Sequence, residues 1–286
     1  MNLPVNVALV TESPSISPRE LTRVAAALQK QVVRDFGPIW SVHATVSALL
    51  SLDDLPIDAW PVVVMDDIGV AGAAGVHEDR RGQPFALVQH SPSWSLTASH
   101  EILEMLGDPF GNRLVAGQSP NAAEDRRVEY LVELCDPCEA VTIAYHVNGV
   151  LVSDFITPRY EDPVAVAGVR YSFTGAITAP HQVLNGGYLS WHDPTDDHWY
   201  QEVYFGDAPE YRDLGVMTGR TGSIRSWIDR QTRVPALSEG LPADDRDVAE
   251  SAGLAAAVAA AAGGRAASLR AQIRELTAAG YRAENP

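Results

Sequence analysis

The chain has 286 residues, of which 46% are hydrophobic, enough to bury the core of one large domain with or without an appendage. Its formal net charge is −16 and Lys30 is its only lysine, so the acidic surface argues against nucleic acid or an anionic membrane as a partner. No apolar run approaches the ~20 residues of a membrane span, and the N-terminus lacks a signal-peptide pattern, so a cytoplasmic location is expected.

The first 90 residues predict strands and one helix. A helix is expected to begin at Ser17, which suits the N-cap, with Pro18 at its first position, and to end near Gly37. Residues 75–82 are polar and read as a turn. Strands are predicted at residues 5–10, 40–46, 60–65 and 84–89. The predicted order is strand, helix and three strands, followed by a second helix.

That second helix begins near Trp94 and carries His100-Glu101-Ile102-Leu103-Glu104. His100 and Glu104 lie one turn apart on one face, and Glu101 lies ~100° round from His100. Apolar residues fill most of the opposite side, and Asp108 before a proline is expected to end the helix. A histidine and a carboxylate at this spacing can share a metal ion. The alternative is an ordinary helix with a solvated acidic face.

The middle of the chain reads as β-rich. Residues 128–135 predict a strand that ends at Asp136-Pro137, and Asn148-Gly149 is a strong hairpin signal between residues 141–147 and 150–156. Further strands are expected at residues 169–173, 181–184 and 199–205. The sequence therefore predicts a domain over residues 1–235 with a β-rich second half, and a linker with a helical tail over residues 236–286.

The motif at His100 resembles the active-site helix of zincin metallopeptidases, whose HExxH supplies two histidine ligands and a glutamate base; here Glu104 replaces the second histidine. The order of elements is similar to the N-terminal half of the zincin fold, in which a mixed sheet covers that helix. There, an edge strand just before the helix pairs with extended substrate, and residues 84–89 would be that strand. The resemblance implies an α+β, zincin-like fold.

The runs SHEILEMLGDP and VELCDPCE are also similar to those of bacterial proteins without an established activity. This second resemblance names no reaction. It associates the helix of His100 with the segment 133–138.

The zincin resemblance implies a metal ion, Zn²⁺ first, with Mn²⁺ or Ca²⁺ as alternatives because oxygen ligands admit them. His100 and Glu104 are the first two expected ligands. Asp136 is the preferred third ligand and Glu133 the second choice, although a turn-capping role is an equal alternative for Asp136. Glu101 is expected to act as the general base of peptide hydrolysis on a peptide or protein substrate.

A carboxylate in place of an imidazole lowers the charge of the metal shell and makes the metal a poorer Lewis acid. The alternative function is therefore a non-catalytic zincin-like binding or assembly module, with a structural metal or none. The sequence does not predict an oligomeric state.

Other polar groups carry weaker signals. Cys135 and Cys138 form one CxxC, which is too little for a four-thiolate zinc site. Residues 192–198 are rich in His and Asp and could line a cleft or bind a second cation, but a surface turn is more typical. His77 and His181 are interpreted as ordinary histidines.

Overall fold

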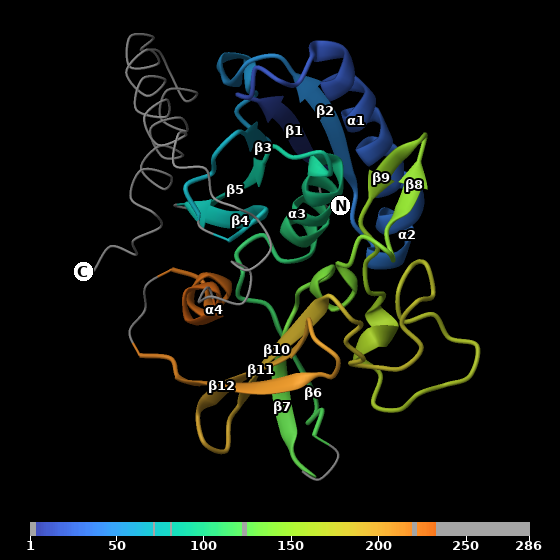
Figure 1. The fold of residues 1–286 in the computed structure, drawn as a ribbon, viewed down its shortest axis with the longest axis vertical. Coiled ribbons are helices and arrows are strands. Elements are labelled where there is room, and N and C mark those ends of the chain that lie inside the picture. Colours follow the sequence, from blue (N-terminus) through green and yellow to red (C-terminus); the bar gives the residue numbers. More distant parts are fainter. Residues whose placement is uncertain (1–3, 71, 81, 122–124, 219–221, 233–286) are drawn as a thin grey trace.

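The computed structural model describes residues 4–70, 72–80, 82–121, 125–218 and 222–232. Within these residues the chain is a mixed α+β structure with two five-stranded sheets and one two-stranded hairpin (Figure 1). The predicted linker and helical tail, residues 236–286, lie outside the described part. None of the described helices is both long enough and apolar enough to cross a bilayer.

The first sheet is mixed and has the strand order β2-β1-β3-β5-β4. Its strands are β1 (Val5–Thr11), β2 (Ala44–Leu49), β3 (Ala59–Met65), β4 (Gly75–Arg80) and β5 (Gln83–Gln89). The pairs β1–β2, β1–β3 and β3–β5 are parallel, and β4 pairs antiparallel with β5. The near-continuous apolar runs of β1 and β3 suit strands that are buried on both faces.

The prediction that residues 84–89 form an edge strand is wrong. β5 lies between β3 and β4, so the edge on that side of the described sheet is β4. The sequence predicts a turn for residues 75–82 because His77, Glu78, Asp79 and Arg80 interrupt any apolar alternation. Backbone pairing from Gly75 opposite Val88 to Arg80 opposite Gln83 nevertheless forms a strand there.

Two helices pack on one face of this sheet. α1 (Pro18–Lys30) begins where predicted, because the Ser17 hydroxyl accepts a hydrogen bond from the Glu20 amide at 3.2 Å. It continues through a π-helical segment, η1 (Gln31–Phe36), into the short helix α2 (Gly37–Trp40). α3 (Trp94–Gly107) confirms the second predicted helix. Leu28 of α1 and Ile102 of α3 share one buried core with Val62 of β3.

The second sheet is antiparallel and has the order β12-β11-β10-β7-β6. Its strands are β6 (Leu114–Gln118), β7 (Arg127–Leu131), β10 (Gly187–Asp193), β11 (His198–Tyr204) and β12 (Glu210–Val216). The helix α4 (Ile224–Thr232) closes a small core in which Trp227 and Ile228 are buried with Leu131 and Trp199. α4 therefore docks between the second sheet and the end of α3 (Figure 1).

The predicted hairpin is confirmed as β8 (Tyr145–Val147) and β9 (Val150–Val152). Asn148 and Gly149 have φ angles of 52° and 75°, the left-handed values that a tight type I′ hairpin turn needs. The remaining described helices are short 3₁₀ turns: η2 (Leu52–Asp54), η3 (Asp136–Cys138) and η4 (Pro158–Glu161).

Two predicted strands are absent from the described structure. Residues 169–173 and 181–184 lie in loops, apart from an isolated bridge between Ile156 and Ser172. Their apolar character has another cause, because Tyr171 is fully buried and its hydroxyl accepts a hydrogen bond from the Val166 amide. Single buried side chains thus anchor this loop without a strand ladder.

Gly187, the first residue of β10, touches the backbone of η3. A Cβ atom at Gly187 would lie 2.5 Å from the carbonyl oxygen of Asp136 and 2.9 Å from that of Pro137. Backbone atoms cannot rotate away as a side chain can. This close approach therefore fixes where the turn that carries Asp136 lies.

Gly187→Ala should destabilise the protein by roughly 1–3 kcal/mol, because η3 would have to shift. Gly206→Ala is the matched control, since no described atom lies within 4 Å of its added Cβ. Its free energy of unfolding should stay within about 0.5 kcal/mol of wild type. Urea denaturation measures both values, and equal stability of the two variants would show that Gly187 does not hold η3.

Candidate metal centre

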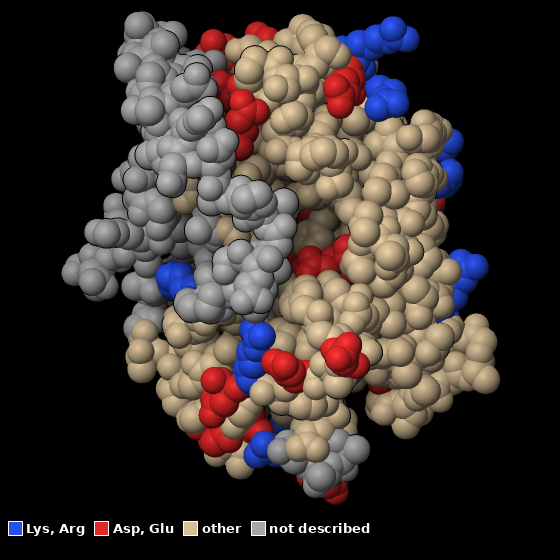
Figure 2. Space-filling view, in the orientation of Figure 1, with Lys and Arg blue, Asp and Glu red and all other residues tan. Residues whose placement is uncertain are grey.

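The polar face of α3 is buried. His100, Glu101 and Glu104 are 9%, 3% and 1% exposed. The alternative prediction of a solvated acidic face is therefore wrong, because β4, the segment around η3 and α4 cover this side of the helix. Figure 2 shows acidic side chains in a hollow at the centre of one face of the molecule.

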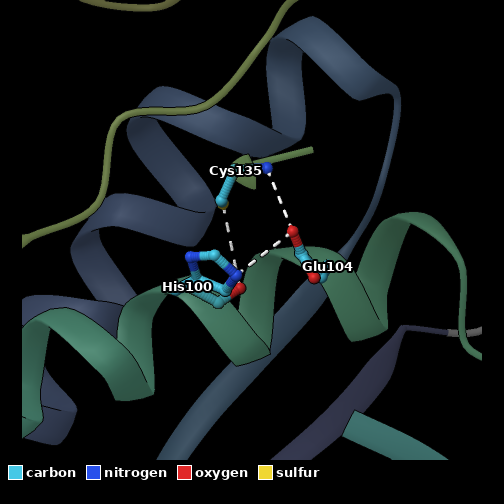
Figure 3. A group of neighbouring side chains, drawn as sticks. All are labelled: His100, Glu104 and Cys135. Atoms are coloured by element: carbon cyan, nitrogen blue, oxygen red, sulfur yellow. Dashed lines mark hydrogen bonds and ion pairs between the residues drawn. The ribbon is translucent and has the colours of Figure 1, made fainter. Parts of the chain in front are cut away.

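The three predicted metal ligands come together at the middle of α3. His100 Nε2 lies 3.2 Å from Glu104 Oε1 and 3.1 Å from Asp136 Oδ1. Asp136 is fully buried at the start of η3. The segment of η3 is attached to the helix as well, since the Cys135 amide donates to Glu104 Oε1 at 3.2 Å and the Cys135 thiol lies 3.8 Å from the His100 carbonyl (Figure 3).

The edge strand β4 adds a histidine that the sequence analysis missed. His77 Nδ1 lies 3.5 Å from Glu101 Oε2 and 3.5 Å from Glu104 Oε2, and the His77 side chain is 2% exposed. Gly75 makes room on the same strand, because a Cβ there would lie 2.5 Å from Glu101 Oε1. The sequence could not identify His77 as part of the site, because the segment that carries it has the pattern of a turn and not of a strand.

The helix α4 adds a buried cation that sequence analysis also missed. Arg225 is 7% exposed, and its Nη1 lies 3.0 Å from Glu104 Oε2 and 3.4 Å from Asp136 Oδ2. The same nitrogen contacts Glu133 Oε2. Nη2 donates to the Tyr188 hydroxyl at 3.2 Å, and Nε donates to Asp229 at 3.1 Å. No local pattern in the sequence marks Arg225 as part of the cluster, because Glu104 and Glu133 lie about 90 to 120 positions earlier.

The charges in this cluster shift one another's protonation. Burial alone would raise the pKa of Glu104, but the charges of His100 and Arg225 outweigh it and hold that pKa well below its usual range. Burial and the charge of Glu104 raise the pKa of Asp136 well above its usual range. Burial would lower the pKa of His100, but Glu104 and Asp136 raise it well above the ordinary value. Without a metal ion, protons thus supply part of the positive charge that these carboxylates need.

Several buried nitrogen and oxygen atoms of the cluster lack hydrogen-bond partners within the described chain. They are His77 Nδ1 and Nε2, Glu101 Oε2, Glu133 Oε1, and Asp136 Oδ1 and Oδ2. Buried polar atoms are nearly always hydrogen-bonded, so this concentration of unpaired atoms needs an explanation.

A cation would satisfy these atoms. Four overlapping groups of His, Cys and carboxylate side chains have donor atoms within 4.8 Å of one another, for example His100, Asp136 and Glu139. Buried His, Glu and Cys side chains could therefore hold a metal ion here. The donors are mainly carboxylate oxygens and imidazole nitrogens, which are common ligands of divalent ions.

The other polar clusters of the sequence lie elsewhere. His192 and Asp197 pair at 3.1 Å in the turn between β10 and β11, and His198 pairs with Asp213 on the neighbouring strand. Among the described residues, none of the groups that could hold a metal includes them. Burial raises the pKa of both the Cys135 and Cys138 thiols well above the usual range, which disfavours the reactive thiolate.

The structure thus defines an α+β protein in which a buried cluster of histidines and carboxylates lies on the polar face of α3. No family model matches the chain, and neither does any curated protein or solved structure.

The metal-free protein should lose stability as the pH rises. Burial is the main cause that raises the pKa of Glu139 from 4.5 to about 7. The stabilisation from a raised carboxyl pKa is complete below the unfolded value and is lost as the pH rises through the folded one. We expect the free energy of unfolding in EDTA to fall by at most about 3 kcal/mol between pH 5 and pH 8 through Glu139.

Asp136 acts in the same direction, because its pKa is raised too. Glu139→Gln should therefore flatten the pH dependence without abolishing it. Urea denaturation at several pH values gives the slope, and an unchanged slope in Glu139→Gln would contradict the assignment.

Proposed function

We propose that the chain is a zincin-like, metal-dependent peptide hydrolase. His100, Glu104 and Asp136 would hold Zn²⁺, with Mn²⁺ or Ca²⁺ as alternatives, and Glu101 would be the general base. One observation carries the proposal: His100 Nε2 lies within 3.2 Å of an oxygen of Glu104 and of one of Asp136, in a buried place. One imidazole and two carboxylates form a ligand set that suits a divalent metal.

The arrangement of the first sheet supports the zincin-like interpretation. A mixed sheet covers α3, and the order of strands and helices up to α3 is the expected one with β4 added before β5. An edge strand could pair with an extended peptide, and β4 is an edge strand of the first sheet among the described residues. β4 also lies directly beside the proposed base, because Gly75 and His77 both face Glu101.

The bound metal would supply Lewis acidity at the substrate carbonyl. Glu101 would take a proton from water and return it to the leaving amine. Its Oε2 has no hydrogen-bond partner in the described chain, so it can accept that proton. His77, 3.5 Å from the same oxygen, would orient the Glu101 carboxylate.

The positive charge of Arg225 offsets the negative charge that Glu104 would add to the metal ligands. Glu104 adds a negative charge to the ligand shell where an imidazole would add none. The guanidinium of Arg225 lies 3.0 Å from Glu104 Oε2 and returns one positive charge to the shell. The metal would therefore keep more of its Lewis acidity than the motif alone implies.

The alternative is a non-catalytic zincin-like binding or assembly module. The burial of the ligands favours it: His100 is 9% exposed and Asp136 is fully buried, which suits a structural ion. Activity measurements on peptides and unfolded proteins, made together with metal analysis, separate the two functions.

The purified protein should carry about one divalent metal ion per chain, held through His100 and Glu104. His100→Ala and Glu104→Ala should each lose that ion, since each removes a ligand from a three-residue set. His192→Ala is the matched control and should keep the metal content of wild type. Elemental analysis measures the content, and wild-type levels in both ligand variants would place the metal elsewhere.

Glu101→Gln should lower peptidase activity by about 10²–10⁴-fold, because it keeps the shape of the side chain but cannot accept a proton. The metal content should stay at the wild-type level. Peptide hydrolysis and elemental analysis on the same preparation test both statements. Full activity in Glu101→Gln would exclude the base role, and a wild type that hydrolyses no peptide would leave only the binding module.

A further inference from the structure

Glu104 and Asp136 each point one carboxylate oxygen toward His100 and the other oxygen toward Arg225. Glu104 Oε1 and Asp136 Oδ1 face His100 Nε2, at 3.2 and 3.1 Å. Glu104 Oε2 and Asp136 Oδ2 face the other way, toward Arg225 Nη1, at 3.0 and 3.4 Å. Both carboxylates therefore bridge from the proposed metal position to a second position.

The second position has its own third carboxylate. Arg225 Nη1 also contacts Glu133 Oε2, so one nitrogen lies among oxygens from three side chains. Those three, Glu104, Glu133 and Asp136, form one of the groups with donor atoms within 4.8 Å of one another. The guanidinium thus occupies the place that a metal ion bound by these oxygens would take.

We propose that Glu104, Glu133 and Asp136 form a second cation site, and that Arg225 and a divalent cation are its alternative occupants. All its protein ligands are oxygens, the set that Mg²⁺, Ca²⁺ and Mn²⁺ prefer. A cation bound there displaces the Arg225 side chain, so the docking of α4 depends on the concentration of divalent cations.

Buried atoms support a cation site beyond the acidic cluster itself. Glu133 is 3% exposed and Asp136 is fully buried. Glu133 Oε1 has no hydrogen-bond partner within the described chain, and the side chain of Asp136 forms ion pairs with His100 and Arg225. A buried carboxylate oxygen that is neither solvated nor hydrogen-bonded favours a nearby cation, and the Arg225 guanidinium contacts only one oxygen of Glu133.

The charges of the cluster support two cations as well. Four carboxylates are buried around α3, namely Glu101, Glu104, Glu133 and Asp136, and Arg225 is the buried guanidinium among them. One divalent ion beside Arg225 leaves one formal negative charge, with both histidines neutral. Two divalent ions without Arg225 leave none. The two occupancies therefore differ little in net charge, as alternative occupants require.

Arg225 can leave without breaking the strand pairs of either sheet, because α4 is held by hydrogen bonds to a loop and by the small core of Trp227 and Ile228. The Arg225 amide donates to the Gly111 carbonyl at 3.0 Å, and the Ile224 amide donates to Asn112 at 2.9 Å. Trp227 packs against Trp199 at a ring separation of 6.4 Å and is 6% exposed. Movement of α4 therefore changes the environment of Trp227 and of Trp199 beside it, which gives an optical signal.

The inference rests on the proposed function only in that Glu104 and Asp136 would be ligands of both the proposed hydrolase metal and the second cation. Mn²⁺ is the probe, and free Mn²⁺ is counted by electron paramagnetic resonance on the full chain. Arg225→Met keeps the apolar volume of the side chain and removes its charge. The Arg225→Met variant should bind one Mn²⁺ more than wild type does. The affinity for this extra ion should be at least about tenfold higher than the affinity of wild type for a second ion. Arg225→Lys is the control and should bind as wild type does.

Glu133→Gln added to Arg225→Met should remove the extra ion. An equal number of ions in wild type and Arg225→Met overturns the proposal, and so does an extra ion that survives Glu133→Gln. If His100→Ala has no effect on metal content while the extra ion behaves as expected, the proposed hydrolase centre fails and the second site stands.

A measurement on wild type covers the case in which Arg225→Met does not fold. Millimolar Mg²⁺ should shift tryptophan emission to longer wavelength as α4 moves. Trp227→Phe should reduce the shift because it removes one of the two tryptophans at this contact, and Glu133→Gln should remove it because it removes a ligand. No shift in folded wild type, or a shift that persists in Glu133→Gln, overturns the competition between Arg225 and the cation.

Discussion

The burial of four carboxylates around α3 is the constraint on which the rest of this structure depends. An ionised group loses its hydration when it is buried, and only opposite charges or hydrogen bonds can compensate. The chain meets this need from three directions: His77 from an edge strand, Arg225 from α4, and His100 from α3 itself. β4 and α4, which pack on the polar face of α3, thus each bring a positively charged or protonatable nitrogen base to the carboxylates.

This constraint also explains why so much of the fold converges on one helix. β4 pairs with β5 in a register that sets His77 opposite Ala86, which puts His77 on the face of the sheet that α3 covers. η3 must follow β7 closely for Asp136 to reach His100, and Gly187 of β10 must lack a side chain for η3 to fit. The second sheet is therefore a scaffold that places η3 and α4, and through them Asp136 and Arg225.

The sequence predicts the local parts of the site and not the distant ones. The spacing of His100 and Glu104 on α3 is a property of a helix, so it could be read directly. Asp136 could be selected because a strand end before a proline restricts its position. His77 could not, since a polar edge strand that is formed by backbone pairing leaves no apolar alternation to read. Arg225 meets Glu104 and Glu133 only in the folded chain, about 90 to 120 positions away, and local patterns carry no such information.

Position 104 and Arg225 are best understood together. In the proposed metal centre, a glutamate in place of a second histidine would change the ligand shell by one negative charge, and a guanidinium against the outer oxygen of that glutamate would restore it. Arginine suits this role because it stays protonated even when buried and offers several donors in a fixed plane. Since a metal responds to the summed charge of its surroundings, a motif read from the ligands alone leaves out half of the relevant groups. The chemistry available to this centre is therefore set as much by α4 as by the helix that carries the motif.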